Sequence, residues 1–191
     1  MSMKDTLARY LRSGRDALLW KTTGLPEYDL RRPLTPTGTN LLGLVRHCAL
    51  VEHGYLVESM GRTSTLALPE VDFDADPNGD FVAGPDETAE SVVALHRAVG
   101  DEVDRSVEAF ELDAPGHVAW WGEDGDTTFG RLLVHVLAEV SRHAGHADIL
   151  REAVDGAAGL NPGNTNLWEP PGGWEAHVAR VAAVAEATRR D

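Results

Sequence analysis

Apolar side chains recur every three to four residues along most of the chain, which is the spacing of one face of an α-helix. These runs predict five helices, at about residues 4–21, 40–60, 85–110, 127–154 and 174–189. No stretch alternates apolar and polar residues clearly enough to predict a strand. The pattern therefore predicts an all-α fold, in which four helices form a bundle and one more helix follows at the C-terminal end.

Residues that favour helix ends support these boundaries. Thr39 or Asn40 is expected to cap the second helix, and Thr127 or Thr128 the fourth. Gly156 is expected to end the fourth helix. We expect one bundle domain over residues 1–160 and an extension over residues 161–191 whose helix packs on the same domain.

The charge balance narrows the classes of partner. The chain of 191 residues has 31 acidic and 17 basic residues, a formal net charge of −14. Such a surface repels nucleic-acid phosphates and anionic lipid, so we expect neither nucleic acid nor a membrane as partner. The N-terminal segment lacks a signal-peptide pattern, and the single Cys48 fits a reducing compartment, so we expect a cytoplasmic protein.

The fourth helix carries the main candidate chemistry. His143 falls within its apolar arc and Glu139 lies at the edge of that arc, one turn earlier, so both side chains can reach one point. Burying them is costly unless a metal ion or a partner Arg compensates them. His47, on the amphipathic second helix, is the candidate third ligand. On spacing alone, a surface ion pair or hydrogen bond remains open for Glu139 and His143.

Four further residues are secondary candidates, each with a plainer alternative. His146 is a candidate proton carrier or a surface histidine. Glu52 is a candidate catalytic base, although we favour an ion pair with an Arg such as Arg142. Trp120 and Trp121 either form the wall of a pocket or anchor a loop.

The remaining signals favour structural roles. His135 is expected to be structural, His53 to be exposed, and Cys48 to be a small buried hydrophobe rather than a nucleophile. The acidic loop at residues 72–80 is not an EF-hand, because it lacks the Gly at position six and the Glu at position twelve.

Two segments, TGTNLLGLVRHCALVEHGY and RLLVHVLAEVSRHAGHADILREAVDG, resemble the DinB/YfiT-like superfamily, and within it an actinobacterial branch of uncharacterised mini-circle-type proteins. The similarity covers most of residues 4–160. It implies a four-helix bundle in which a His and a later His-x-x-x-His or Glu-x-x-x-His pair bind one metal ion. His47, Glu139 and His143 match that motif. The chain has Glu where many relatives have His, as does the related mycothiol-dependent maleylpyruvate isomerase.

This resemblance also implies a function. Three protein ligands leave one coordination position open, as in catalytic zinc sites. We expect a metal-dependent enzyme acting on a small molecule, assisted by a low-molecular-weight thiol such as mycothiol, as a transferase, isomerase or hydrolase. Zinc is the expected metal, with nickel and iron as alternatives. The competing hypotheses are a non-catalytic metal-binding or stress-associated protein, and a metal-free interaction module that forms a homodimer.

Overall fold

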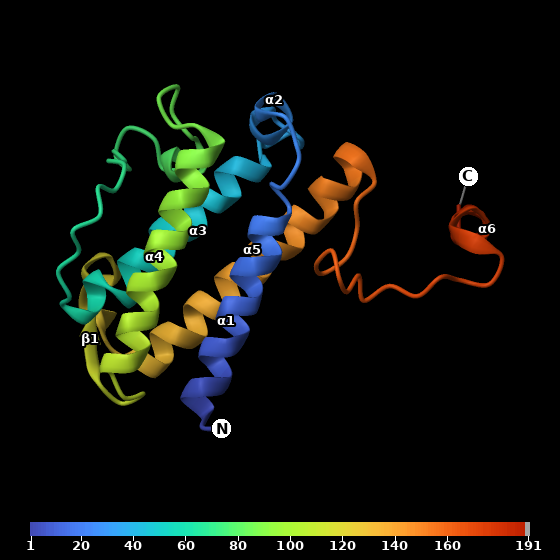
Figure 1. Ribbon diagram of the computed structural model, residues 1–191. Helices are drawn as coiled ribbons and strands as arrows, with labels where there is room; N and C mark the ends of the chain where they lie inside the picture. The colour runs from blue at the N-terminus through green and yellow to red at the C-terminus, as the bar shows by residue number, and fades with distance from the viewer. Residues whose placement is uncertain (190–191) are drawn as a thin grey trace. The chain divides into compact units, whose positions relative to one another are not determined.

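The computed structural model describes residues 1–189, and the chain divides into two compact units, Met1–Ala158 and a second from Gly159 onward. Four long helices form the first unit (Figure 1): α1 (Met3–Trp20), α3 (Leu41–Leu56), α4 (Ala89–Ala109) and α5 (Phe129–Asp155). The predicted four-helix bundle is therefore confirmed.

Local capping explains where these helices begin and end. The side chain of Asn40 accepts a hydrogen bond from the backbone N–H of Gly43, and Thr128 caps α5 in the same way. Gly156 ends α5 in the left-handed conformation at φ 77°, which glycine adopts without steric cost. Helix α4 begins later than predicted, because Thr88 caps it rather than the earlier Pro85.

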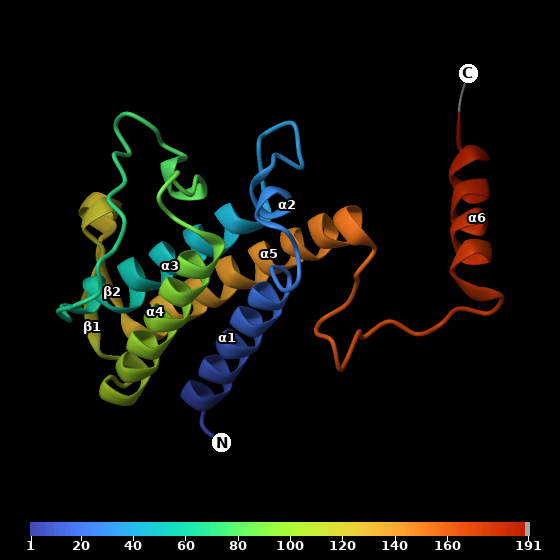
Figure 2. The ribbon, with the colours of Figure 1, turned by 45° about the horizontal axis from the view of Figure 1, so that its top comes forward.

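Helix α3 is buried over a larger share of its length than the other long helices. It packs against both α4 and α5, and α1 lies along α5 (Figure 2). The run Leu41–Arg46 is buried without interruption, so the first turns of α3 are covered on every side. Because α3 and α5 pack directly together, side chains on their facing surfaces can form one site.

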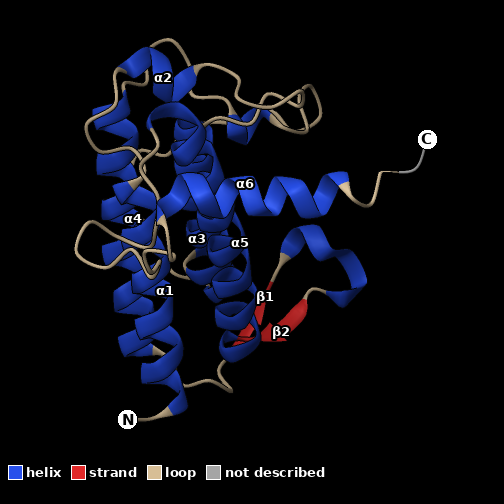
Figure 3. Cartoon of the chain, turned by 90° about the vertical axis from the view of Figure 1, so that its right-hand side faces the viewer, coloured by secondary structure: helices blue, strands red, loops and turns tan. Residues whose placement is uncertain are grey.

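Several short elements complete the first unit. A helix of five residues, α2 (Glu27–Arg31), precedes α3. Two short 3₁₀ turns, η1 (Glu58–Met60) and η2 (Gly79–Phe81), lie between α3 and α4, and a third, η3 (Ala119–Asp124), lies between α4 and α5. Two antiparallel strands, β1 (Pro115–His117) and β2 (Asp126–Thr128), flank η3 (Figure 3). The sequence analysis, which predicted no strand, missed this ribbon, because three residues are too few to show alternation.

The second unit holds one helix, α6 (Gly173–Glu186), which carries apolar residues along one face at Trp174, Val178, Val181 and Val184. That the extension packs on the bundle remains a prediction, and its last two residues lie outside the described range. Among the helices that the structure describes, none is long and apolar enough to cross a membrane.

Candidate metal centre

Helices α3 and α5 run antiparallel where they meet. The rings of His47 and His143 have their centroids 4.7 Å apart, and so do those of Tyr55 and His135. Two turns forward along α3 therefore correspond to two turns back along α5. This pairing places His47 opposite the Glu139–His143 turn, although 92 residues separate Glu139 from His47.

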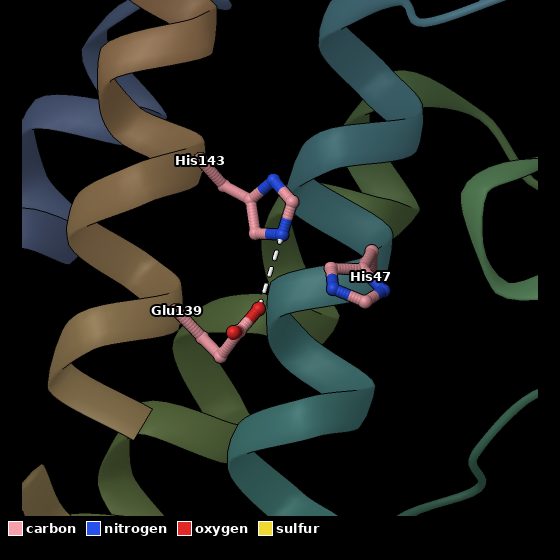
Figure 4. Close-up of side chains that lie close together, drawn as sticks. All are labelled: His47, Glu139 and His143. Carbon is pink, nitrogen blue, oxygen red and sulfur yellow. Dashed lines mark ion pairs between the residues drawn. The ribbon is translucent and has the colours of Figure 1, made fainter. Parts of the chain in front are cut away.

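His47, Glu139 and His143 converge on one point. Each offers a nitrogen or carboxylate oxygen, and these three atoms lie within 4.8 Å of one another. Figure 4 shows a ring nitrogen of His47 and the Nε2 of His143 facing the Glu139 carboxylate, which lies 3.4 Å from that Nε2. Among the residues described, this is the one group of three or more such side chains with metal-binding spacing.

The 3₁₀ turn η2 fixes the orientation of His47. Asp80 in this turn lies with its Oδ2 2.6 Å from His47 Nδ1, and Phe81 stacks on the imidazole with ring centroids 3.9 Å apart. The buried guanidinium of Arg46 donates to the backbone oxygens of Gly79 and Asp80, at 3.0 Å each. A carboxylate on Nδ1 makes that nitrogen the donor, so Nε2 keeps its lone pair for a ligand.

The electrostatics of the cluster fit a cation. Burial, followed by the charge of His47, lowers the pKa of His143 to about 4, so its imidazole is neutral at pH 7. His47 Nε2 and His143 Nδ1 are buried and have no hydrogen-bond partner within the described chain. Two imidazoles beside a carboxylate that is partly open to solvent are a donor set that suits a divalent ion such as Zn²⁺.

His146 is exposed beside this cluster. Its ring centroid lies 5.4 Å from that of His143, one turn further along α5. The ring therefore contacts His143 and is also open to solvent. Its catalytic role is still a prediction.

Glu52 occupies a different environment, in the core between α1, α3 and α4. Its Oε2 lies 2.5 Å from Arg15 Nε, so the favoured ion pair with an Arg is present, with Arg15 of α1 as the partner in place of Arg142. His96 Nε2 lies 3.5 Å from the other carboxylate oxygen. Burial raises the pKa of Glu52 to about 7, against the opposing effect of Arg15. Because this carboxylate is fully buried, we assign it no direct part in chemistry.

Two other residues of α3, His53 and Cys48, are buried in the bundle. The prediction that His53 is exposed is wrong: it is 2% exposed and lies 3.6 Å from Glu102 of α4. Cys48 is buried and free, as predicted, and burial raises the pKa of its thiol. A thiol that stays protonated is a poor nucleophile, which agrees with its expected structural role.

An aromatic cluster lies two turns along α3 from His47. The indole N–H groups of Trp120 and Trp121 both donate to Tyr55 Oη, at 3.1 and 3.2 Å. The His135 ring contacts both Tyr55 and Trp121. Trp120 lines a cavity beside α3, whereas Trp121 lines a separate hollow with His135. That these tryptophans form a substrate pocket remains a prediction, and the sequence analysis missed Tyr55 as the group that joins them.

The fold and the cluster together define a class: a DinB/YfiT-like helical bundle with a candidate His₂Glu metal centre between its second and fourth long helices. Comparison with known proteins is more specific. Residues 6–156 match the model of the mycothiol-S-transferase family, and the chain belongs to that family. No curated protein matches the chain.

Proposed function

We propose that this protein is a metal-dependent S-transferase that joins a low-molecular-weight thiol, mycothiol by family membership, to a small electrophile. The observation that carries the proposal is the convergence of His47, Glu139 and His143 within 4.8 Å of one another in a chain of this family. The exposure of part of the Glu139 side chain leaves the cluster accessible to a small thiol.

In this proposal, His47, Glu139 and His143 hold one divalent ion, with zinc preferred and nickel or iron as alternatives. When bound, the ion supplies a Lewis acid that lowers the pKa of a coordinated thiol, so that the reactive thiolate forms near neutral pH. Asp80 and Phe81 keep the His47 ring in one orientation, so the ligand set needs little rearrangement to bind the ion.

The chain's own residues have the remaining tasks. The thiol proton passes to the exposed His146 and from there to solvent. A sulfur–carbon bond then forms on the electrophile, and the bond from that carbon to its leaving group breaks, with the electron pair departing on the leaving group. Tyr55, two turns along α3 from His47, and Trp120 provide an amphipathic wall that shields the electrophile from water.

The test is turnover of the zinc-loaded protein with mycothiol and chlorodinitrobenzene, which loses chloride on S-arylation. We expect a rate above that of the uncatalysed reaction, which chelation and the variants Glu139→Ala and His143→Ala abolish. His117→Ala is the matched control, because His117 is exposed on β1 outside the cluster.

A spectroscopic test accompanies turnover. In protein loaded with cobalt(II), added mycothiol is expected to produce a sulfur-to-metal charge-transfer band. If no thiol gives turnover and none changes the cobalt spectrum, the S-transferase proposal is overturned. Stoichiometric metal with a large loss of thermal stability on chelation would then favour the non-catalytic metal-binding alternative.

A further inference from the structure

A cavity of about 630 Å³ is lined by residues of α3 and of the segment at residues 68–80. Its volume is within the range of ~300–1,000 Å³ that is usual for sites that bind small molecules. Val51, Gly54 and Tyr55 of α3 and Trp120 of η3 are among the residues that line it. The cavity is therefore large enough for a compact aromatic molecule.

One residue, Asp80, links the cavity to the candidate metal centre. Asp80 lines the cavity, and its carboxylate also forms a hydrogen bond with His47 Nδ1. Val51 and Tyr55 follow His47 by one and two helical turns and therefore lie on the same face of α3. Asp80 is therefore the residue that connects the cavity to His47, which is not itself among the lining residues.

The lining is apolar with a negative rim. Leu50, Leu68 and Phe73 are among its apolar residues, and Glu58 and Glu70 are exposed carboxylates at its edge. No Lys or Arg occurs among the described residues that line it. The net charge of −14 adds to the same negative field.

We infer that this cavity binds the electrophilic co-substrate and that it selects apolar molecules that are neutral or cationic over anionic ones. The inference rests on the proposed S-transferase function and adds the class of acceptor to it. The apolar walls favour an aromatic or aliphatic body, and the carboxylates of Glu58, Glu70 and Asp80 repel an anionic group.

The experiment measures binding without chemistry. Dinitrobenzene and dinitrobenzoate share a ring, differ by one negative charge and carry no leaving group, so calorimetric titration of each gives its affinity in the absence of thiol. We expect dinitrobenzene to bind at least about fivefold more tightly, an effect of the size that a few carboxylates near a surface produce.

Two pairs of variants locate the effect. Leu50→Trp fills the cavity and should weaken dinitrobenzene binding about tenfold by removing its apolar contacts. Val134→Trp, in the separate hollow beside Trp121, should leave that affinity unchanged. Glu70→Lys should reduce the ratio of the affinity for dinitrobenzene to that for dinitrobenzoate about threefold. Glu108→Lys makes the same change in net charge on the exposed side of α4, and it should leave the preference for dinitrobenzene over dinitrobenzoate unchanged.

Equal or tighter binding of dinitrobenzoate would overturn the inference, and so would an unchanged affinity for dinitrobenzene in Leu50→Trp. These outcomes are distinct from failure of the S-transferase proposal. Charge-selective binding without thiol transfer contradicts the proposed function and leaves the binding cavity in place. Thiol transfer that uses chlorodinitrobenzene and chlorodinitrobenzoate equally well overturns the acceptor selectivity alone.

Discussion

At the scale of single residues, Asp80 has the clearest assignable role outside the three candidate ligands. Its carboxylate accepts from His47 Nδ1, which leaves Nε2 free to bind an ion. We predict that Asp80→Ala weakens zinc affinity about ten- to hundredfold, as measured by competition with a chromophoric chelator. Asp80→Asn should lose less zinc affinity than Asp80→Ala, because its amide oxygen still accepts the hydrogen bond from His47. Asp74→Ala, an exposed change in the same loop, should have no effect.

The buried pair Glu52 and His96 should contribute opposite pH dependences to stability. Burial lowers the pKa of His96 from 6.5 to about 3, so the unfolded chain binds a proton there that the folded protein does not. The contribution of neutral His96 to the free energy of unfolding is therefore lost as the pH falls below 6.5. Burial raises the pKa of Glu52 from 4.5 to about 7, so its contribution is full below pH 4.5 and is lost as the pH rises through 7.

Urea unfolding of Glu52→Gln and His96→Gln across pH 4.5–7 tests this prediction. Relative to wild type, Glu52→Gln should become less stable as the pH falls, and His96→Gln should become more stable. Each difference should change by at most ~1.4 kcal/mol per pH unit. If the free energy of unfolding changes with pH in both variants as it does in wild type, neither group titrates as described.

The three candidate ligand residues could be found from the sequence, but their surroundings could not. Spacing on α5 suggested Glu139 and His143, and the amphipathic second helix suggested His47. Asp80 lies 33 residues from His47 in a loop whose path depends on tertiary contacts with Arg46. The pairing of Glu52 with Arg15 depends on which helix packs against which, and spacing within one helix does not determine that.

At the scale of elements, the close approach of η2 to α3 depends on a glycine. A Cβ on Gly43 would lie 2.0 Å from the carbonyl oxygen of Phe81. We predict that Gly43→Ala costs about 1–3 kcal/mol of unfolding free energy and also weakens metal binding, because Asp80 and Phe81 must move away from His47. Thermal unfolding and metal titration of the same variant test both effects.

Gly145 of α5 provides the matched comparison. A Cβ there meets nothing within 4 Å, so Gly145→Ala should stabilise the protein by about 0.5–1 kcal/mol through helix propensity alone. Metal affinity should be unchanged. Loss of stability in Gly145→Ala, or none in Gly43→Ala, would contradict this account of the two helices.

The long helices could be predicted because their apolar period extends over many turns and capping residues mark their ends. The short elements could not. Helix α2 has five residues, and η2 and each strand have three, which is less than the length over which a period can be recognised. Their conformations depend on tertiary contacts, such as the pairing of Gly116 with Thr127.

At the scale of the whole molecule, the net charge leads to a prediction about nucleic acid. With a net charge of −14, we predict no measurable binding of duplex DNA at physiological salt, as tested by fluorescence anisotropy of a labelled duplex. Binding that weakens steeply with added salt would contradict this prediction, because it would require a basic surface.

We predict above all that this member of the mycothiol-S-transferase family holds one metal ion on His47, Glu139 and His143. Mass-spectrometric metal analysis of untagged wild type, Glu139→Ala, His143→Ala and the control His117→Ala tests it most directly. The account predicts close to one divalent ion per chain in wild type and control, with loss in both ligand variants while circular dichroism shows an intact bundle. A wild-type protein that contains no metal and takes up neither zinc, nickel nor iron would contradict it.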